Sequence, residues 1–178
     1  MSDLIVACVG GPMDRVRQWR DRIAQHLRIP YDLMCLTEDG DWVEGVTVVD
    51  TSVLRLPGPW AVMMLFEPQW RGRKKIIFLD LDLPLDGDLA PLARVPGEFA
   101  IGADEGGGYD ARVMVIGGGM AGFVWTAFDT RRDEMMARHR TPAAVLAAIY
   151  PGAPLLKGVP VSRETPPRSG EAPATRTI

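Results

Sequence analysis

The chain has 178 residues, of which 47% are hydrophobic and 24% are charged, and its formal net charge is -3. This length predicts one domain, and this composition is that of a globular protein with a packed core, not of a disordered chain. The acidic balance gives no general attraction to nucleic acid or to an anionic membrane. The N-terminus carries Asp3 where a secretory signal is basic, and no apolar run is long enough to span a membrane. We therefore expect a cytoplasmic protein without a transmembrane segment.

The cysteines and histidines do not form a recognisable metal site. Cys8 and Cys35 have neither the spacing of a zinc site nor that of a CxxC redox pair. Without a secretory signal, we interpret them as reduced thiols in the core. His26 and His139 each fall in an expected helix, where a surface position is commoner than metal ligation.

The first half of the chain begins as a parallel α/β fold. Residues 4–9 form a continuous apolar run that ends at Gly10 and Gly11, which is typical of a strand buried on both faces. Further strands are expected at residues 31–36 and 46–49.

Residues 12–27 predict an amphipathic helix between the first two strands. Apolar side chains recur every three or four residues, and Pro12 suits the first helical position. The opposite face of this helix carries four arginines, Arg15, Arg17, Arg20 and Arg22. This basic face fits either plain solvent exposure, the commoner use, or contact with an anionic partner.

The second half continues with strands and then helices. The expected elements are a short buried helix at 60–66, strands at 75–79, 99–101 and 113–116, and helical segments at 122–139 and 142–150. A glycine-rich loop, residues 103–110, joins the last two strands. Residues 162–178 are polar and proline-rich, which predicts a flexible tail.

Two acids, Asp80 and Asp82, directly follow the expected central strand at 75–79. Ligands of open α/β sheets bind at the carboxyl ends of strands. Alternate residues of an extended chain point the same way, so the two carboxylates can share one hard cation, which in turn can hold a diphosphate. Without a cation, their proximity would raise the pKa of at least one carboxyl. The alternative interpretation is that both acids only cap a turn.

Other nucleotide and phosphate motifs fit less well. Residues 78–82 also resemble the nucleophile strand of haloacid-dehalogenase phosphatases, but Pro84 stands where that family has Thr or Val. The glycines at 117–119 and at Gly10 and Gly11 lack the GxGxxG spacing, and no P-loop lysine pattern is present. These glycines are interpreted as turns.

The stretch 76–92, which contains Asp80 and Asp82, resembles the DxD segment of bacterial nucleotide-sugar glycosyltransferases of the GT-A fold. The likeness extends in order over roughly residues 4–130. Its other segments, which resemble strands and a tryptophan-containing helix of that family, are residues 26–37, 58–66, 99–104 and 109–116.

This resemblance implies one GT-A-like domain over residues 1–161, with a mixed, mostly parallel central sheet flanked by helices. It implies transfer of a sugar from a nucleotide-sugar donor to an acceptor, with Mn²⁺ or Mg²⁺ as cofactor and Asp80 and Asp82 as metal residues. The metal would neutralise charge on the departing nucleoside diphosphate while an acceptor hydroxyl attacks the anomeric carbon. The implied substrate-binding residues are Gly10 and Gly11 at the base, Asp80 at the ribose, and Asp104 and Asp110 at the sugar. No catalytic residue is assigned.

The sequence departs from the family pattern at several positions. Val62 and Met63 stand where the family has a lysine, Asp110 and Ala111 stand where it has Asn or Ser, and glycines at 117–119 replace Trp-Asp. The Gly-Asp-Gln segment and the late His-Gly-Lys cluster are also missing from the sequence. These departures keep a second hypothesis open: a non-catalytic GT-A-like protein that binds nucleotide, a glycan or a protein partner.

Overall fold

The computed structural model describes residues 2–38, 41–68, 74–117 and 120–156. The tail predicted at 162–178 and the end of the expected domain, 157–161, lie outside these residues, as do positions 118 and 119. Within the described residues, no helix is long and apolar enough to cross a membrane.

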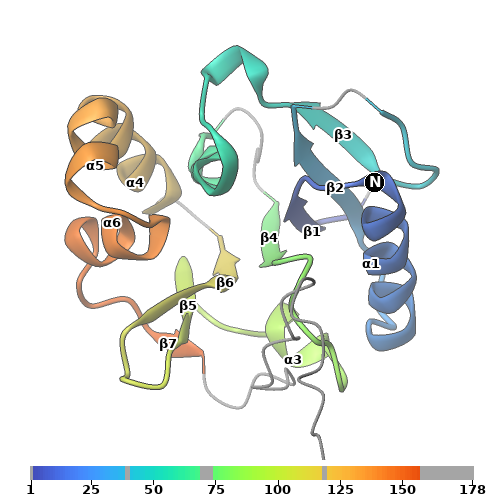
Figure 1. The fold of residues 1–178 in the computed structure, drawn as a ribbon. Coiled ribbons are helices and arrows are strands. Elements are labelled where there is room, and N and C mark those ends of the chain that lie inside the picture. Colours follow the sequence, from blue (N-terminus) through green and yellow to red (C-terminus); the bar gives the residue numbers. More distant parts are fainter. Residues whose placement is uncertain (1, 39–40, 69–73, 118–119, 157–178) are drawn as a thin grey trace, which may run out of the picture.

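The described residues form one seven-stranded sheet in the order β3-β2-β1-β4-β6-β5-β7 (Figure 1). The strands are β1 (Leu4–Val9), β2 (Asp32–Thr37), β3 (Thr47–Asp50), β4 (Lys75–Leu79), β5 (Phe99–Ala103), β6 (Tyr109–Ile116) and β7 (Leu155–Leu156). Only β6 is antiparallel to its described neighbours, β4 and β5; the other pairings are parallel. The predicted mixed, mostly parallel sheet is confirmed.

Helices cover both faces of the sheet, because alternate strand residues point to opposite sides. In β1, Ile5 and Ala7 join one core cluster, while Val6 and Cys8 join the other. The first cluster packs under η2 (Gly58–Phe66), α4 (Met120–Asp129) and α6 (Pro142–Ile149), and the second under α1 (Met13–His26) and α3 (Ala90–Ala93). The remaining helices are η1 (Ser52–Leu54) and α5 (Arg132–Arg138). Both cysteines are buried free thiols.

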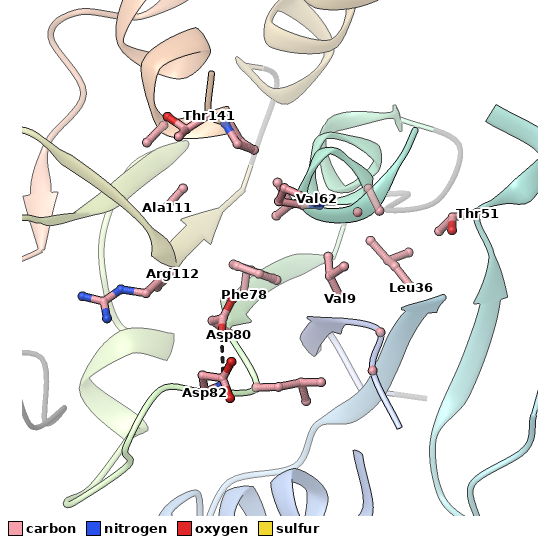
Figure 2. Close-up of a pocket in the computed structure, with 18 of the residues that line it drawn as sticks. Val9, Leu36, Thr51, Val62, Phe78, Asp80, Asp82, Ala111, Arg112 and Thr141 are labelled. Atoms are coloured by element: carbon pink, nitrogen blue, oxygen red, sulfur yellow. Dashed lines mark hydrogen bonds between the residues drawn. The ribbon is translucent and has the colours of Figure 1, made fainter. Parts of the chain in front are cut away.

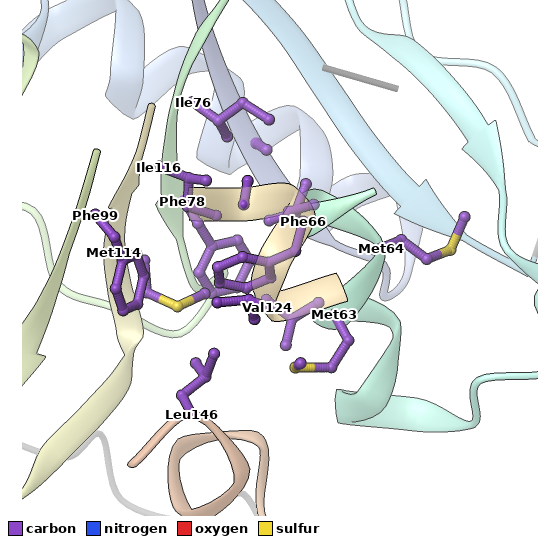
Figure 3. Packing of buried hydrophobic residues seen from close by; sticks show 14 of the residues in the cluster. Met63, Met64, Phe66, Ile76, Phe78, Phe99, Met114, Ile116, Val124 and Leu146 are labelled. Atoms are coloured by element: carbon purple, nitrogen blue, oxygen red, sulfur yellow. The ribbon is translucent and has the colours of Figure 1, made fainter. Parts of the chain in front are cut away.

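Two helix predictions need correction in detail. The buried helix expected at 60–66 is a 3-10 helix over Gly58–Phe66, and its residues 61–66 are all buried. Figure 3 shows its Phe66 against the sheet, and the Phe66 and Phe99 ring centroids lie 5.5 Å apart, edge to face. The segment 122–139 is divided into α4 and α5, because Thr130 donates its hydroxyl hydrogen to the Thr126 carbonyl and Arg131 leaves helical geometry.

A bulge in β6 shapes the edge where β4 ends. Ile101 pairs with Met114 and Gly102 pairs with Asp110, so residues 111–113 of β6 have no partner in β5. Arg112 in the bulge accepts a hydrogen bond at its carbonyl from the Asp80 backbone N–H, at 2.9 Å. The bulge therefore places β6 residues directly beside Asp80. The loop expected at 103–110 is shorter, because β5 extends to Ala103 and β6 begins at Tyr109.

Gly102 is required for this bulge. A Cβ atom at Gly102 would lie 2.8 Å from the Asp110 carbonyl oxygen, which is part of the backbone and cannot rotate away. We expect Gly102→Ala to lower the free energy of unfolding by about 1–3 kcal/mol, the usual result of overpacking. Urea unfolding measures this, with Gly152→Ala as control, because a Cβ there meets nothing within 4 Å. Equal stability of both variants would contradict the assigned bulge.

Candidate functional site

A cleft of about 820 Å³ opens at the edge of the sheet where β1, β2 and β4 end. Its walls include every residue expected at a site: Gly10, Gly11, Asp80, Asp82, Asp104 and Asp110. The strand order brings these residues together, because the carboxyl ends of neighbouring parallel strands meet at one edge. The structure thus gathers residues from four separate segments of the chain around one cavity.

The two ends of the cleft differ in polarity. Figure 2 shows Asp80, Asp82 and Arg112 at one end, and Val9, Leu36 and Thr51 toward the other. Thr51 is 1% exposed, and its hydroxyl has no hydrogen-bond partner among the described residues. The apolar end therefore also presents an unsatisfied polar group.

Gly10 and Gly11 let the backbone after β1 approach its neighbours closely. The Gly10 N–H donates to the Leu36 carbonyl at 2.6 Å, and a Cβ at Gly10 would lie 2.6 Å from Thr37 Oγ1. A Cβ at Gly11 would lie 3.1 Å from Leu81 Cδ1. The glycines thus keep the start of α1 close to the turn that carries Asp80 and Asp82.

The acidic end is built on a tight turn after β4. Asp80 Oδ1 accepts a hydrogen bond from the Asp82 backbone N–H at 2.8 Å, and the Asp80 carbonyl accepts one from Leu83 N–H at 3.1 Å. Asp80 therefore does cap a turn, as the alternative interpretation proposed. The Asp82 carboxylate forms an ion pair with Arg15, which projects from the first turn of α1.

The pKa values of two acids of the cleft, Asp80 and Asp110, are shifted in opposite directions. Burial raises the pKa of the Asp80 carboxyl, and the charges of Arg112 and Arg15 only partly oppose this. Burial also acts to raise the pKa of Asp110, but hydrogen bonds from Arg112 outweigh it and the pKa is lowered. Arg112 donates a bidentate pair of hydrogen bonds to Asp110, with Nε 3.0 Å from Oδ1 and Nη2 2.7 Å from Oδ2.

Asp104 is held in the hairpin between β5 and β6. Its Oδ1 accepts a hydrogen bond from Gly108 N–H at 2.7 Å, and its backbone N–H donates to the Gly108 carbonyl at 3.0 Å. A Cβ at Gly108 would lie 2.7 Å from Asp104 Oδ2, so a larger residue there would have to displace the Asp104 carboxylate. Asp104 therefore closes the turn while it lines the cleft.

Seven polar residues of this cleft were not predicted as site residues: Arg15, Thr37, Glu38, Thr51, Tyr109, Arg112 and Thr141. Thr141 was expected as an N-cap, and its Oγ1 does accept a hydrogen bond from Ala144 N–H at 3.2 Å. Its position at the cleft depends on how α6 packs against the rest of the fold, and the local sequence does not show this packing. The histidines lie elsewhere: His26 ends α1, and His139 follows α5.

The acidic end offers two carboxylates to a divalent cation. The described residues contain no group of three or more His, Cys, Asp or Glu side chains that could hold a metal ion. Mg²⁺ is commonly bound by one or two carboxylates together with substrate phosphates and water. Asp80 and Asp82 are carboxylates of the type that such a cation uses, although here Asp82 pairs with Arg15 and Asp80 caps the turn.

No family model matches the chain, and no curated protein matches it. Several solved structures are similar to it. The glycosyltransferase GlyE of Streptococcus pneumoniae is 18% identical with a TM-score of 0.64, over 86% of this chain and 45% of that one. The bifunctional glycosyltransferase WbbM is 13% identical with a TM-score of 0.57, over 86% and 38%. The galactosyltransferase LgtC, in a complex with donor and acceptor sugar analogues, is 12% identical with a TM-score of 0.53, over 85% and 72%.

The chain has a GT-A glycosyltransferase fold. It spans less than half the length of GlyE and WbbM. At these sequence identities the similarity shows a shared GT-A fold and assigns no role to an individual residue.

The raised pKa of Asp80 predicts a pH-dependent gain in stability for Asp80→Asn. Between the ordinary and the raised pKa, the folded protein binds more protons than the unfolded one, so wild-type stability falls as pH rises through that window. Asn keeps an acceptor for the Asp82 N–H but carries no charge. We expect Asp80→Asn to melt at a higher temperature than wild type at about pH 7, and the gap to narrow toward the ordinary Asp pKa of about 3.9.

Asp110→Asn is the matched comparison for this measurement. Its lowered pKa predicts the opposite sign, because the charged form of Asp110 is stabilised by Arg112 and that stability is lost with the charge. Differential scanning calorimetry across pH measures both variants. A lower melting temperature for Asp80→Asn at neutral pH would contradict the assigned desolvation of Asp80.

Proposed function

We propose that this chain is a glycosyltransferase domain, over residues 1–161, that takes a sugar from a nucleotide-sugar donor with the help of a divalent cation. The observation that carries the proposal is the make-up of the cleft on a GT-A fold: Asp80, Asp82 and Arg112 lie at one end, and the wall of Val9 and Leu36 lies toward the other, beside the polar residues Thr37, Glu38 and Thr51. A nucleotide-sugar has the same polarity, with a flat base at one end and a diphosphate and sugar at the other.

The spacing of the strands supports this orientation. Asp80 follows β4 and Thr51 follows β3, and β1 and β2 lie between these two strands. Three strand spacings amount to about 14 Å, which is comparable with an extended nucleoside diphosphate. The base would lie against Val9 and Leu36, where the Thr51 hydroxyl is left for one of its polar edges.

The charged end is suited to the diphosphate and the sugar. Asp80 and Asp82 would hold Mn²⁺ or Mg²⁺, which when bound neutralises the negative charge that develops on the leaving nucleoside diphosphate. Asp80 would also face the ribose. Asp110, fixed by the bidentate hydrogen bonds of Arg112, and Asp104, fixed in the hairpin, would accept hydrogen bonds from sugar hydroxyls. Such prearranged acceptors hold a donor in a defined orientation.

A second candidate function is donor or glycan binding without transfer. The observation that favours it is Val62, which is 4% exposed and lines the cleft where the family resemblance expects a lysine. This candidate predicts nucleotide binding without donor cleavage.

Thermal-shift measurements with UDP, GDP and CMP donors, each with and without Mn²⁺, test the proposal. A donor at about 100 times its dissociation constant should stabilise the protein by about 2.7 kcal/mol, which is about 5–10 °C for a chain of this size. The shift should depend on Mn²⁺ and should be lost in Asp82→Asn.

Asp3→Asn is the control, because Asp3 is exposed and precedes β1 at the opposite edge of the sheet. It should keep the full metal-dependent shift. Absence of a shift with every donor and metal would contradict the proposed function. A shift without donor hydrolysis or transfer would select the binding candidate.

A further inference from the structure

Arg15 pairs with one of the two carboxylates that the proposed function gives to a cation. Its guanidinium contacts Asp82 Oδ1, and both side chains face solvent, with 41% of Arg15 and 59% of Asp82 exposed. Arg15 also lines the cleft, and its charge acts on Asp80 as well. A positive charge therefore already pairs with one of the two carboxylates that are expected to hold the cation.

Arg15 is the member of the basic face of α1 that reaches the cleft. Of the four arginines, Arg17 and Arg22 are exposed, and Arg20 bonds Asp21 and the Glu44 carbonyl. None of these three is among the residues that line the cleft. The close approach of Gly11 to Leu81 sets the first turn of α1 beside the Asp80–Asp82 turn, which brings Arg15 to Asp82.

A divalent cation bound to Asp82 and the Arg15 guanidinium repel each other, because like charges a few ångströms apart oppose each other. A bound cation therefore weakens the ion pair and competes with Arg15 for Asp82. A solvent-exposed ion pair is weak, so its exchange is easy. Arg112, by contrast, donates several hydrogen bonds to Asp110 and is already committed to that carboxylate.

We infer that Arg15 exchanges partners during donor binding. Without a ligand it neutralises Asp82; when a divalent cation takes Asp82, Arg15 turns to the diphosphate of the donor, where guanidinium groups bind well. Arg15 is then a binding residue for the leaving group and a competitor of the free metal. This inference rests on the proposed function and adds to it a role for a residue that the resemblance does not mark.

Arg15→Gln separates the two roles, because they predict opposite changes. With Mn²⁺ alone, the variant should bind the metal about threefold to tenfold more tightly, since a positive charge beside the site is gone. With saturating Mn²⁺, it should bind UDP or GDP about threefold to tenfold more weakly, since a charge-assisted contact is lost. Manganese EPR measures the first constant and titration calorimetry the second.

Two further variants serve as controls. Arg17→Gln removes an equal charge from the same helix outside the cleft and should change neither constant. Arg15→Lys keeps the charge and should restore nucleotide binding toward wild type. Circular dichroism and melting curves establish that each variant is folded.

The outcomes distinguish this inference from the proposed function. If Arg15→Gln leaves both constants unchanged, or weakens both together, the exchange is wrong while metal-dependent donor binding still stands. If wild type and variant bind neither Mn²⁺ nor nucleotide, the proposed function fails and this inference fails with it.

Discussion

The carboxylate of Asp80 stands at the end of a strand that is buried on both faces, and the surrounding residues limit the energetic cost of keeping it there. Burial raises its pKa, while Arg112 and Arg15 oppose that rise from two different elements. Its own side chain also caps the turn that leads to Asp82. A charge kept at such a site despite its cost is typical of a functional position.

The same edge of the sheet explains why chemically different residues share one cleft. The parallel strands β1, β2 and β4 end at this edge, and the bulge of β6 lies beside them. Distant segments of the chain therefore supply the glycines, carboxylates, arginines and apolar wall of the cleft. The sheet fixes these groups, whereas the Arg15–Asp82 ion pair at its rim is exposed to solvent and therefore weak. This combination suits a ligand with an apolar and an anionic end.

Much of this arrangement could be predicted from the sequence, where the controlling interactions are local. Strands 4–9 and 75–79 were predicted with their observed bounds, because a run buried on both faces is apolar throughout. Asp80 and Asp82 were identifiable because they interrupt the apolar sequence directly after β4. Arg112 was not, because its place depends on a register shift opposite Gly102. The nearness of Arg15 to Asp82 depends on how α1 packs, and periodicity shows only which face of that helix is apolar.

The most direct test of the account is a crystal structure of the protein with Mn²⁺ and UDP, using anomalous scattering to locate the manganese. The account predicts manganese between Asp80 and Asp82, diphosphate within reach of Arg15, and the base against Val9 and Leu36. Nucleotide bound instead in the second cavity, beside β2 and β3 and lined by Asp32 and Lys74, would contradict it.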